Sequence, residues 1–244
     1  MLTRKQRINR ILSLAGVTSR RKADELITAG RVTVNGRRVD HLGSSAVWGT
    51  DRIAVDGRDI PGPSPRIYIM LNKPFGYVSA LSDPADRPLV TDLLKGIPER
   101  LYPVGRLDFD SLGLLLMTND GEWAHHVAHP RYRVPKTYKV TLSGYISPEA
   151  LGALRKGLTL EDGFSGPAKV TLLKRSPDRS LIRMTIARGR SRLVRRMVES
   201  VGHQVIQLLR TGVGSLELGD LKMGAYRHLE THEVESMKKM VGLL

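Results

Sequence analysis

The chain has 244 residues, of which 41% are hydrophobic, so it is long enough for two unequal domains and too apolar to be wholly disordered. It carries 39 Lys and Arg against 24 Asp and Glu, a formal net charge of +15, and a protein this basic usually binds a polyanion. The absence of cysteine excludes disulfides, thiol catalysis and cysteine-ligated zinc. Because the sequence has neither an apolar run of about 20 residues nor a signal-peptide core, we expect a cytoplasmic protein without membrane contact.

Two short helices are predicted near the start of the chain. Apolar residues share one helical face between residues 8 and 15, and a second helix begins at Thr18 or Ser19 and ends before Gly30. Cations occupy the first turn of this second helix, which is the end where the helix dipole disfavours them. A phosphate ligand would explain this placement. The residues concerned are Arg20, Arg21 and Lys22.

A β-hairpin and a proline-rich linker follow these helices. Asn35-Gly36 between two alternating runs is typical of a two-residue hairpin turn, and a further strand is predicted at 52–55. Residues 1–66 hold 13 Lys and Arg against 6 Asp and Glu, so this part of the chain is strongly basic. Three prolines within 61–65 exclude a helix or a central strand there. We therefore predict three parts: a small domain at 1–60, a linker at 61–66 and a larger domain at 67–244.

The larger domain mixes strands and helices without a regular alternation. This pattern favours an α+β fold, with a mainly antiparallel mixed sheet and flanking helices, over a doubly wound parallel sheet. The predicted strands are 67–71, 114–117, 137–142, 168–174, 181–187 and 204–210, and the predicted helices are 148–156, 192–201 and 232–240, the last capped by Thr231.

A polar loop at 105–113 leads directly into the buried strand at 114–117 and places Asp108 at the mouth of that strand. From the residues alone, an acid that caps local backbone amides is the more common interpretation. Asp108-Phe109-Asp110 also fits an Asp-x-Asp phosphotransfer motif. That chemistry needs a magnesium site with further acids, which we cannot assign from the sequence.

Arginine is concentrated in one segment, where five of the nine residues from 188 to 196 are Arg. On a helix that begins near Ser191, Arg192 shares a face with Arg195 and Arg196. Guanidinium groups suit bidentate contacts with phosphate or carboxylate, although a solvated basic face would have the same pattern.

Two further features are weaker signals. Tyr138 on the inward face of a strand is, by itself, more often a core residue than a functional one. His125, His126 and His129 lack the Glu of the metalloprotease pattern, so we interpret them as structural or RNA-facing and predict no metal site. No phosphate-binding glycine loop or dinucleotide fingerprint is present, so no nucleotide cofactor is indicated.

Together these segments resemble the ribosomal-RNA pseudouridine synthases of the RsuA/RluB type. The resemblance covers nearly the whole chain, and its N-terminal block, from Ala15 to Gly36, is similar to the small RNA-binding fold named for ribosomal protein S-four. One departure is Leu193, where many relatives have Gln or Glu. The matching segments are Gly-Arg-Leu-Asp at 105–108, Gly-Leu-Leu-Leu at 113–116, Thr-Asn-Asp-Gly at 118–121, Lys-Thr-Tyr at 136–138, the arginine-rich run at 189–197 and Asn-Lys-Pro at 72–74.

The resemblance implies a cofactor-free isomerase that detaches the uracil of a flipped-out uridine, rotates it and rejoins it to the ribose through carbon. It implies that Asp108 is the catalytic carboxylate in its ionised form, that Arg195 pairs with it and that Tyr138 stacks on the uracil. Arg106 would fill the space that the flipped base leaves. Further RNA contacts are expected from Arg190, Arg192, Arg196, Lys73, Arg20, Arg21, Lys22 and Arg31.

The expected partner is ribosomal RNA or a ribosomal assembly intermediate, bound by a monomer. The segment 160–163 favours a site in large-subunit RNA, and the same reaction on small-subunit RNA is the close alternative. A second alternative is a ribosome-binding or RNA-chaperone protein without catalysis. That protein would be expected to lack Asp108, Tyr138 or Arg195, and all three are present.

Overall fold

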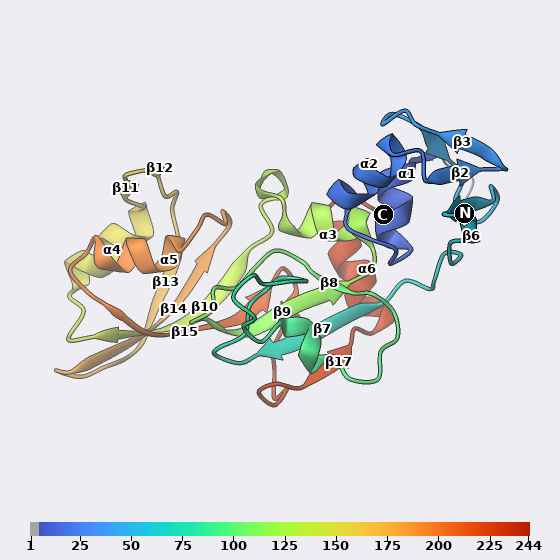
Figure 1. Cartoon of the computed structure of the whole chain (residues 1–244). Helices are drawn as coiled ribbons and strands as arrows, with labels where there is room; N and C mark the ends of the chain where they lie inside the picture. Colours follow the sequence, from blue (N-terminus) through green and yellow to red (C-terminus); the bar gives the residue numbers. More distant parts are fainter. Residues whose placement is uncertain (1–4) are drawn as a thin grey trace. The chain divides into compact units, whose positions relative to one another are not determined.

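Figure 1 shows the computed structural model of the chain, which describes residues 5–244. The structure separates into two compact units. The first unit contains the residues up to Arg66 together with Ile97–Arg100, and the second contains Ile67–Gly96 and Leu101–Leu244. The residues predicted as a linker, 61–66, belong to the first unit, and no sequence signal predicted that Ile97–Arg100 packs with that unit.

The first unit is built from two helices and small antiparallel sheets, and the predicted helices, hairpin and strand are all present. Asn35 and Gly36 form the hairpin turn with φ angles of 51° and 79°, in the left-handed region that such turns require. The elements are β1 (Gln6–Arg7), α1 (Ile8–Leu14), α2 (Arg20–Thr28), β2 (Val32–Val34), β3 (Arg37–Val39), β4 (Ser45–Ala46), β5 (Ile53–Val55) and β6 (Arg58–Asp59). Four of the strands form a sheet in the order β3-β2-β5-β6, and β1 pairs with β4.

Capping and apolar packing hold the first unit together. The Ser19 hydroxyl accepts a hydrogen bond from the backbone N–H of Lys22 at 3.3 Å and so caps α2. Ile11 and Ile27, from the two helices, are almost completely buried in a core that also contains Val32. The buried face of α2 therefore holds the helix in place, while the cations of its first turn are exposed.

The second unit is organised around a long mixed sheet with the strand order β13-β14-β10-β15-β9-β7-β17. Neighbouring strands along this order are antiparallel except β15 and β9, which are parallel, and this confirms the predicted α+β class. The strands are β7 (Tyr68–Lys73), β8 (Tyr102–Pro103), β9 (Leu112–Thr118), β10 (Lys136–Ser143), β13 (Lys169–Arg175), β14 (Arg179–Ile186), β15 (Val205–Val213), β16 (Leu216–Glu217) and β17 (Tyr226–His228). A separate hairpin is formed by β11 (Thr159–Leu160) and β12 (Gly163–Phe164).

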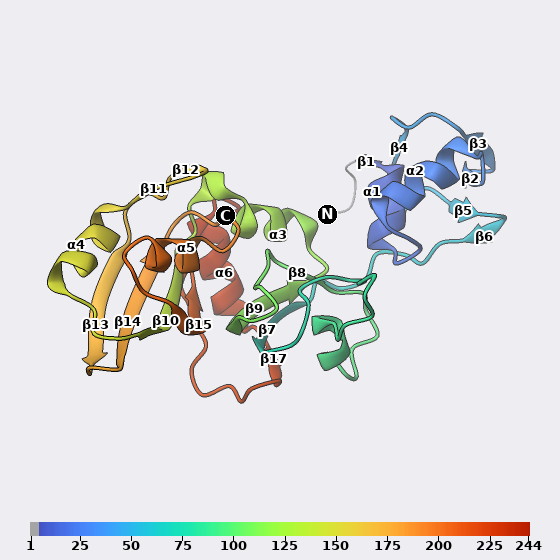
Figure 2. The same ribbon diagram turned by 60° about the vertical axis from the view of Figure 1, so that its left-hand side comes forward.

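Four helices accompany this sheet, and in both views they lie on the same side of it (Figures 1 and 2). They are α3 (Gly121–Ala128), α4 (Pro148–Lys156), α5 (Leu193–Glu199) and α6 (Thr231–Met240), with 3-10 turns at Val90–Leu93 and Pro130–Tyr132. None of the helices in residues 5–244 combines the length and the apolarity that crossing a bilayer requires.

The predicted helix bounds needed small corrections. α5 begins one residue later than expected because Arg192 has a φ of 49°, a left-handed conformation that does not continue a right-handed helix. Thr231 is the first residue of α6 rather than its cap, and the cap position belongs to Glu230. α3 was indicated by the sequence only as a possible helix around the histidines. Its start follows ordinary rules, since the Asp120 carboxylate accepts hydrogen bonds from the N–H groups of Glu122 and Trp123.

β9 lies at the centre of the core, with all seven residues buried. Leu114 and Leu116 pack in one cluster with Trp123 of α3 and Met237 of α6. A strand buried on both faces has a continuous apolar run of residues, which is why this strand was recognisable from the sequence. β9 is therefore a rigid base for the polar loop that precedes it.

Gly113 allows β9 and β15 to meet at their parallel junction, which consists of the pairs Leu112 with Leu209 and Gly113 with Arg210. Its φ is +100°, and a Cβ atom at this position would lie 2.2 Å from the backbone oxygen of Arg210. Both the backbone conformation and the lack of space therefore require glycine.

We expect Gly113→Ala to lower the free energy of unfolding by clearly more than the about 1–2 kcal/mol that a left-handed conformation alone costs a residue with a side chain. Denaturant unfolding would measure this change. Gly224→Ala is the matched control, because Gly224 has a φ of +77° and a Cβ atom added there would meet no other atom within 4 Å. Equal costs for the two variants would contradict a steric role for Gly113.

Candidate active site

Asp108 lies on the loop between β8 and β9, half-buried, and lines a pocket of about 200 Å³. Within residues 5–244 no hydrogen bond or ion pair is formed by its carboxylate, although the backbone oxygen of Asp108 accepts a hydrogen bond from the N–H of Ser111 at 3.0 Å. The loop is therefore closed by its backbone, and the acidic side chain is left available to a ligand.

Ser79 holds the residue before Asp108 in place. Its hydroxyl donates to the backbone oxygen of Leu107 at 2.9 Å and accepts from the backbone N–H of Leu107 at 3.2 Å. Ser79 and Leu107 are both buried, so this reciprocal contact is shielded from water. The position of Asp108 is thus set on its N-terminal side by a residue that was not predicted from the sequence.

Lys73 holds the other side of the loop, and its predicted contact with RNA is wrong. The side chain has 0% exposure, and its ammonium donates to the backbone oxygens of Ser111 at 2.8 Å, Pro74 at 3.0 Å and Phe109 at 3.5 Å. Burial lowers the pKa of Lys73 to about 8, against the opposing effect of Asp110 and Asp108. A lysine enclosed in this way supports the loop from within the protein and cannot reach a phosphate.

Arg195 does not form the expected pair with Asp108. Its Nη2 lies 3.1 Å from Oδ2 of Asp110 and also donates to the backbone oxygen of Asp110 at 3.1 Å. Asp110 is bound as well by Arg192, at 3.3 Å. The reason is positional: the two acids are two residues apart on the same loop, and Asp110 is the one that contacts α5 and the residue before it. Arg195 is buried and does not line the pocket, so in this structure it positions the loop.

Tyr138 lines the same pocket as Asp108, as expected from the sequence. It lies on β10, an interior strand of the sheet, is 9% exposed and pairs with Met184 on β14 and Arg210 on β15. The pocket volume is below the about 300–1,000 Å³ typical of sites for drug-sized ligands, so it suits a small group.

Lys136 and Arg210 also line this pocket, and no role was predicted for them from the sequence. Lys136 lies two residues before Tyr138, so the two-residue period of a strand places both side chains on one face. This spacing could have identified Lys136. Arg210 is 5% exposed and donates to the backbone oxygens of Leu114 at 2.7 Å and Arg106 at 3.4 Å, long-range contacts that no local pattern reveals.

Burial lowers the pKa of Lys136 to about 8, and the nearby Arg210 contributes to this lowering. Asp108 is the single acid among the lining residues, which otherwise include five cations. The pocket therefore combines one carboxylate with a strongly positive wall. Such a wall attracts a polyanion, and the single carboxylate can contact one group of that polyanion. The cations are Arg106, Lys136, Arg190, Arg192 and Arg210.

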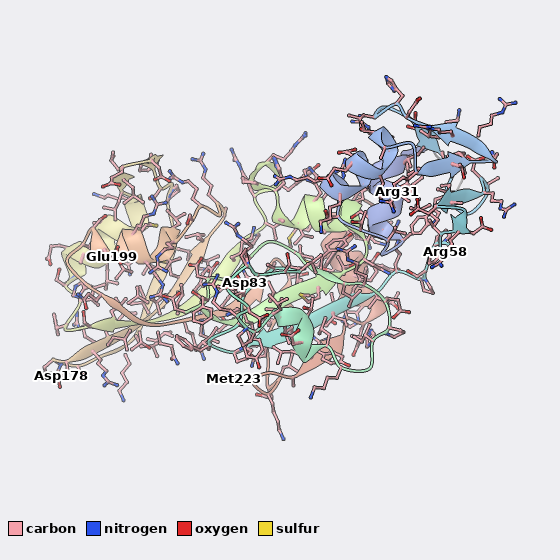
Figure 3. The ribbon with its side chains drawn as sticks, viewed as in Figure 1. Arg31, Arg58, Asp83, Asp178, Glu199 and Met223 are labelled. Atoms are coloured by element: carbon pink, nitrogen blue, oxygen red, sulfur yellow. The ribbon has the colours of Figure 1, made fainter. Side chains whose placement is uncertain are left out.

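The other residues predicted to contact RNA differ in their exposure and in whether they form ion pairs. Arg106 and Arg192 are exposed on the pocket wall, whereas Arg190 and Arg196 both pair with Asp162, at 3.0 and 2.8 Å. In the first unit Arg31, labelled in Figure 3, forms a two-contact ion pair with Asp56. The remaining three, in the first turn of α2, are exposed and form no ion pair among the described residues: Arg20, Arg21 and Lys22.

The histidine cluster has structural contacts. The His126 ring stacks on Tyr132 at 4.2 Å, and its Nδ1 lies 3.2 Å from the backbone oxygen of Val241. His129 Nδ1 accepts a hydrogen bond from the backbone N–H of Arg131 at 3.3 Å. These contacts join the end of α3 to the following turn and to the C-terminal segment.

Comparison with known proteins identifies the family. Residues 67–200 match the family model described as RNA pseudouridylate synthase, and residues 6–44 match the S4 domain. The chain is 45% identical over 237 residues to ribosomal large subunit pseudouridine synthase B of Bacillus subtilis, covering 96% of both chains. It is 42% identical to an uncharacterized RNA pseudouridine synthase of Aquifex aeolicus, covering 97% of this chain and 95% of that one.

A solved structure described as a pseudouridylate synthase covers 95% of this chain and 99% of its own, with a TM-score of 0.69 and 30% identity. The chain therefore belongs to the RNA pseudouridylate synthase family and carries an S4 domain at its N-terminal end. The resemblance inferred from the sequence motifs is confirmed. The protein is an isomerase that acts on uridine in RNA.

We expect Lys136→Met to stabilise the protein at pH 7 by roughly 1–3 kcal/mol, because the variant no longer buries a charge. A folded-state pKa of about 8 lies below that of the unfolded chain, so the cost of the charge is complete below pH 8 and disappears as the pH rises toward about 10.5. The stability difference between variant and wild type should shrink over the same range, as measured by urea unfolding at several pH values.

Lys139→Met is the matched control for this prediction, because Lys139 is exposed on the same strand. It should leave the stability profile unchanged. A gain for Lys136→Met that does not vary with pH would show that packing, rather than the buried charge, is responsible.

Proposed function

We propose that the protein isomerises a uridine of ribosomal RNA of the large subunit, with Asp108 as the catalytic carboxylate. The observation that carries this proposal is that Asp108 and Tyr138 line one small pocket while the Asp108 carboxylate is left without a partner among the described residues. The name of the Bacillus subtilis relative, which is similar along nearly its whole length, supports the choice of substrate. Such a substrate implies that the protein works in the cytoplasm.

The chemistry requires little beyond the pocket itself. The N-glycosidic bond breaks and a carbon–carbon bond forms between the same base and ribose, so the product has the composition of the substrate. The uridine must leave its stack in folded RNA, which costs a few kcal/mol, and the Tyr138 ring offers the extruded uracil a surface to stack on. Arg106, which is exposed and lines the pocket, would occupy the vacated position in the RNA.

The surroundings of the two loop acids separate their roles. Asp110 forms ion pairs with Arg192 and Arg195, so its carboxylate fixes the loop. These two arginines would also repel a metal cation. This disfavours the Asp-x-Asp phosphotransfer interpretation, in which both acids would bind magnesium. Asp108 has no such partner among the described residues. It is thus the acid free to act on the nucleotide.

Asp108→Asn should lower the isomerisation rate by more than roughly 1,000-fold while RNA binding is retained, because the amide keeps the shape and removes the reacting charge. Release of tritium from RNA labelled at C5 of uracil would measure the reaction, since C5 loses its hydrogen when it bonds to the ribose. Asp110→Asn is the matched control on the same loop and should retain much more activity. A rate for Asp108→Asn equal to that of the wild type would remove this catalytic assignment.

The substrate is tested by mapping pseudouridine, through chemical labelling and primer extension, in both ribosomal RNAs from cells with and without the protein. The proposal requires a site in large-subunit RNA that disappears with the protein. A site lost from the small-subunit RNA instead would support the same chemistry on the alternative substrate. No lost site in either RNA would contradict the proposed substrate class.

Replacing Arg20, Arg21 and Lys22 by Gln should weaken binding of large-subunit RNA and flatten its salt dependence, by about 0.7–0.9 in the log–log slope for each phosphate contact that is lost. The rate on saturating RNA should stay unchanged, because the first turn of α2 supplies affinity rather than chemistry. A variant with Lys at positions 20 and 21 keeps the charge and should keep the slope. An unaltered slope in the Gln variant would show that these residues do not contact phosphate.

A further inference from the structure

A second pocket in the larger unit, about 740 Å³ in volume, is open beside the first. The two pockets share Gly189 and Arg190 as lining residues, so a chain that enters the active site can continue into this pocket. We call it the hairpin pocket, since the β11–β12 hairpin forms one wall and the turn after α3 forms another; Figure 2 shows these two segments side by side. The charged and aromatic residues that line it are Arg131, Arg133, Asp162, Phe164, Arg188 and Arg190.

The charge of the hairpin pocket is positive and largely uncompensated. Its one acid, Asp162, is bound by Arg190 and Arg196 at 3.0 and 2.8 Å. Arg131, Arg133 and Arg188 are exposed and form no ion pair within residues 5–244. Arginines that gain nothing from the protein's own carboxylates are available to phosphate groups, which they can contact through two N–H donors each.

Phe164 presents an aromatic ring within this charged surface. It is 51% exposed at the end of the β11–β12 hairpin, although exposing an aromatic ring to water is energetically unfavourable. Its backbone is fixed, because Arg190 donates a hydrogen bond to the Phe164 oxygen and another to the Asp162 oxygen. An aromatic ring on a fixed backbone, beside arginines that form no ion pair among the described residues, is the combination that single-stranded nucleic acid binds, through base stacking and backbone charge.

We propose that the hairpin pocket binds one unpaired nucleotide adjacent to the target uridine, with its base stacked on Phe164 and its phosphate held by Arg131, Arg133 and Arg188. This inference rests on the proposed function, because it assumes that an RNA strand enters the neighbouring pocket. It assigns the hairpin a role in selecting RNA whose target lies in a loop or other unpaired segment, since a base-paired neighbour could not stack on the ring.

The Asp162 contacts explain how the hairpin is connected to the active site. Arg196 belongs to α5, the helix that also carries Arg195, and Arg190 lies on the wall of both pockets. Through Asp162 the hairpin is thus attached to the same segment that holds the Asp110 side of the catalytic loop. A nucleotide in the hairpin pocket and a uracil in the active site would be positioned by one rigid group of residues.

The test uses the full-length Asp108→Asn protein as background, so that binding is measured without turnover. The probe is unmodified large-subunit ribosomal RNA transcribed in vitro. Phe164→Ala should weaken binding about tenfold, the effect of one lost base–aromatic stack, and Phe164→Trp should restore it. Tyr145→Ala is the matched control, because Tyr145 is 52% exposed and lines neither pocket; it should bind as tightly as the background protein.

Two further measurements separate this inference from the proposed function. With Asp108 intact, Phe164→Ala should raise KM with kcat nearly unchanged, and replacing Arg131 and Arg188 by Gln should reduce the salt slope by about 0.7 for each lost contact with single-stranded RNA. RNA substituted with 4-thiouridine should photocrosslink to the peptide that contains Phe164. Unchanged binding in Phe164→Ala together with no crosslink to the hairpin would overturn the inference, even if Asp108→Asn abolishes isomerisation.

Discussion

The buried ammonium of Lys73 forms the interactions on which the loop that carries Asp108 depends. It donates hydrogen bonds to three backbone oxygens, those of Pro74, Phe109 and Ser111, and the residue has no solvent exposure. Burying a charge is costly unless its hydrogen-bonding capacity is used, and here all three donors of the ammonium are used. The loop therefore cannot shift without leaving a charge unsatisfied. This constraint keeps Asp108 at the mouth of β9, with its carboxylate bound to no partner among the described residues.

Asp108 and Asp110 lie on the same loop, but they have different neighbours and therefore different roles. Asp110 is bound by two arginines, and Asp108 faces a pocket whose other charged walls are cationic. The side chains that fix the loop are thus distinct from the one available to the substrate. The same arrangement leaves Lys136 partly buried in a wall of cations, a local cost that is consistent with a site kept for binding RNA rather than for stability.

Much of the fold was predictable because its signals are local. The Asn35-Gly36 turn, the apolar run of β9 and the Ser147-Pro148 start of α4 each follow from the residues of one segment. The site was predictable only in part. Tyr138 and Asp108 line one pocket as expected, but the partner of Arg195 depended on which of two nearby acids contacts α5. The burial of Lys73 depended on a strand and a loop about 38 residues apart, and no sequence pattern reveals such a contact.

The parallel junction between β9 and β15 links the two halves of the sheet that form the candidate active-site pocket. The junction joins the β13–β15 half of the sheet to the β9–β17 half through just two residue pairs. The candidate active-site pocket lies across it, with the Asp108 loop on one side and β10, β14 and the arginine-rich segment on the other. Because each half supplies part of the wall, the spacing between β9 and β15 at this junction also sets the distance across the pocket.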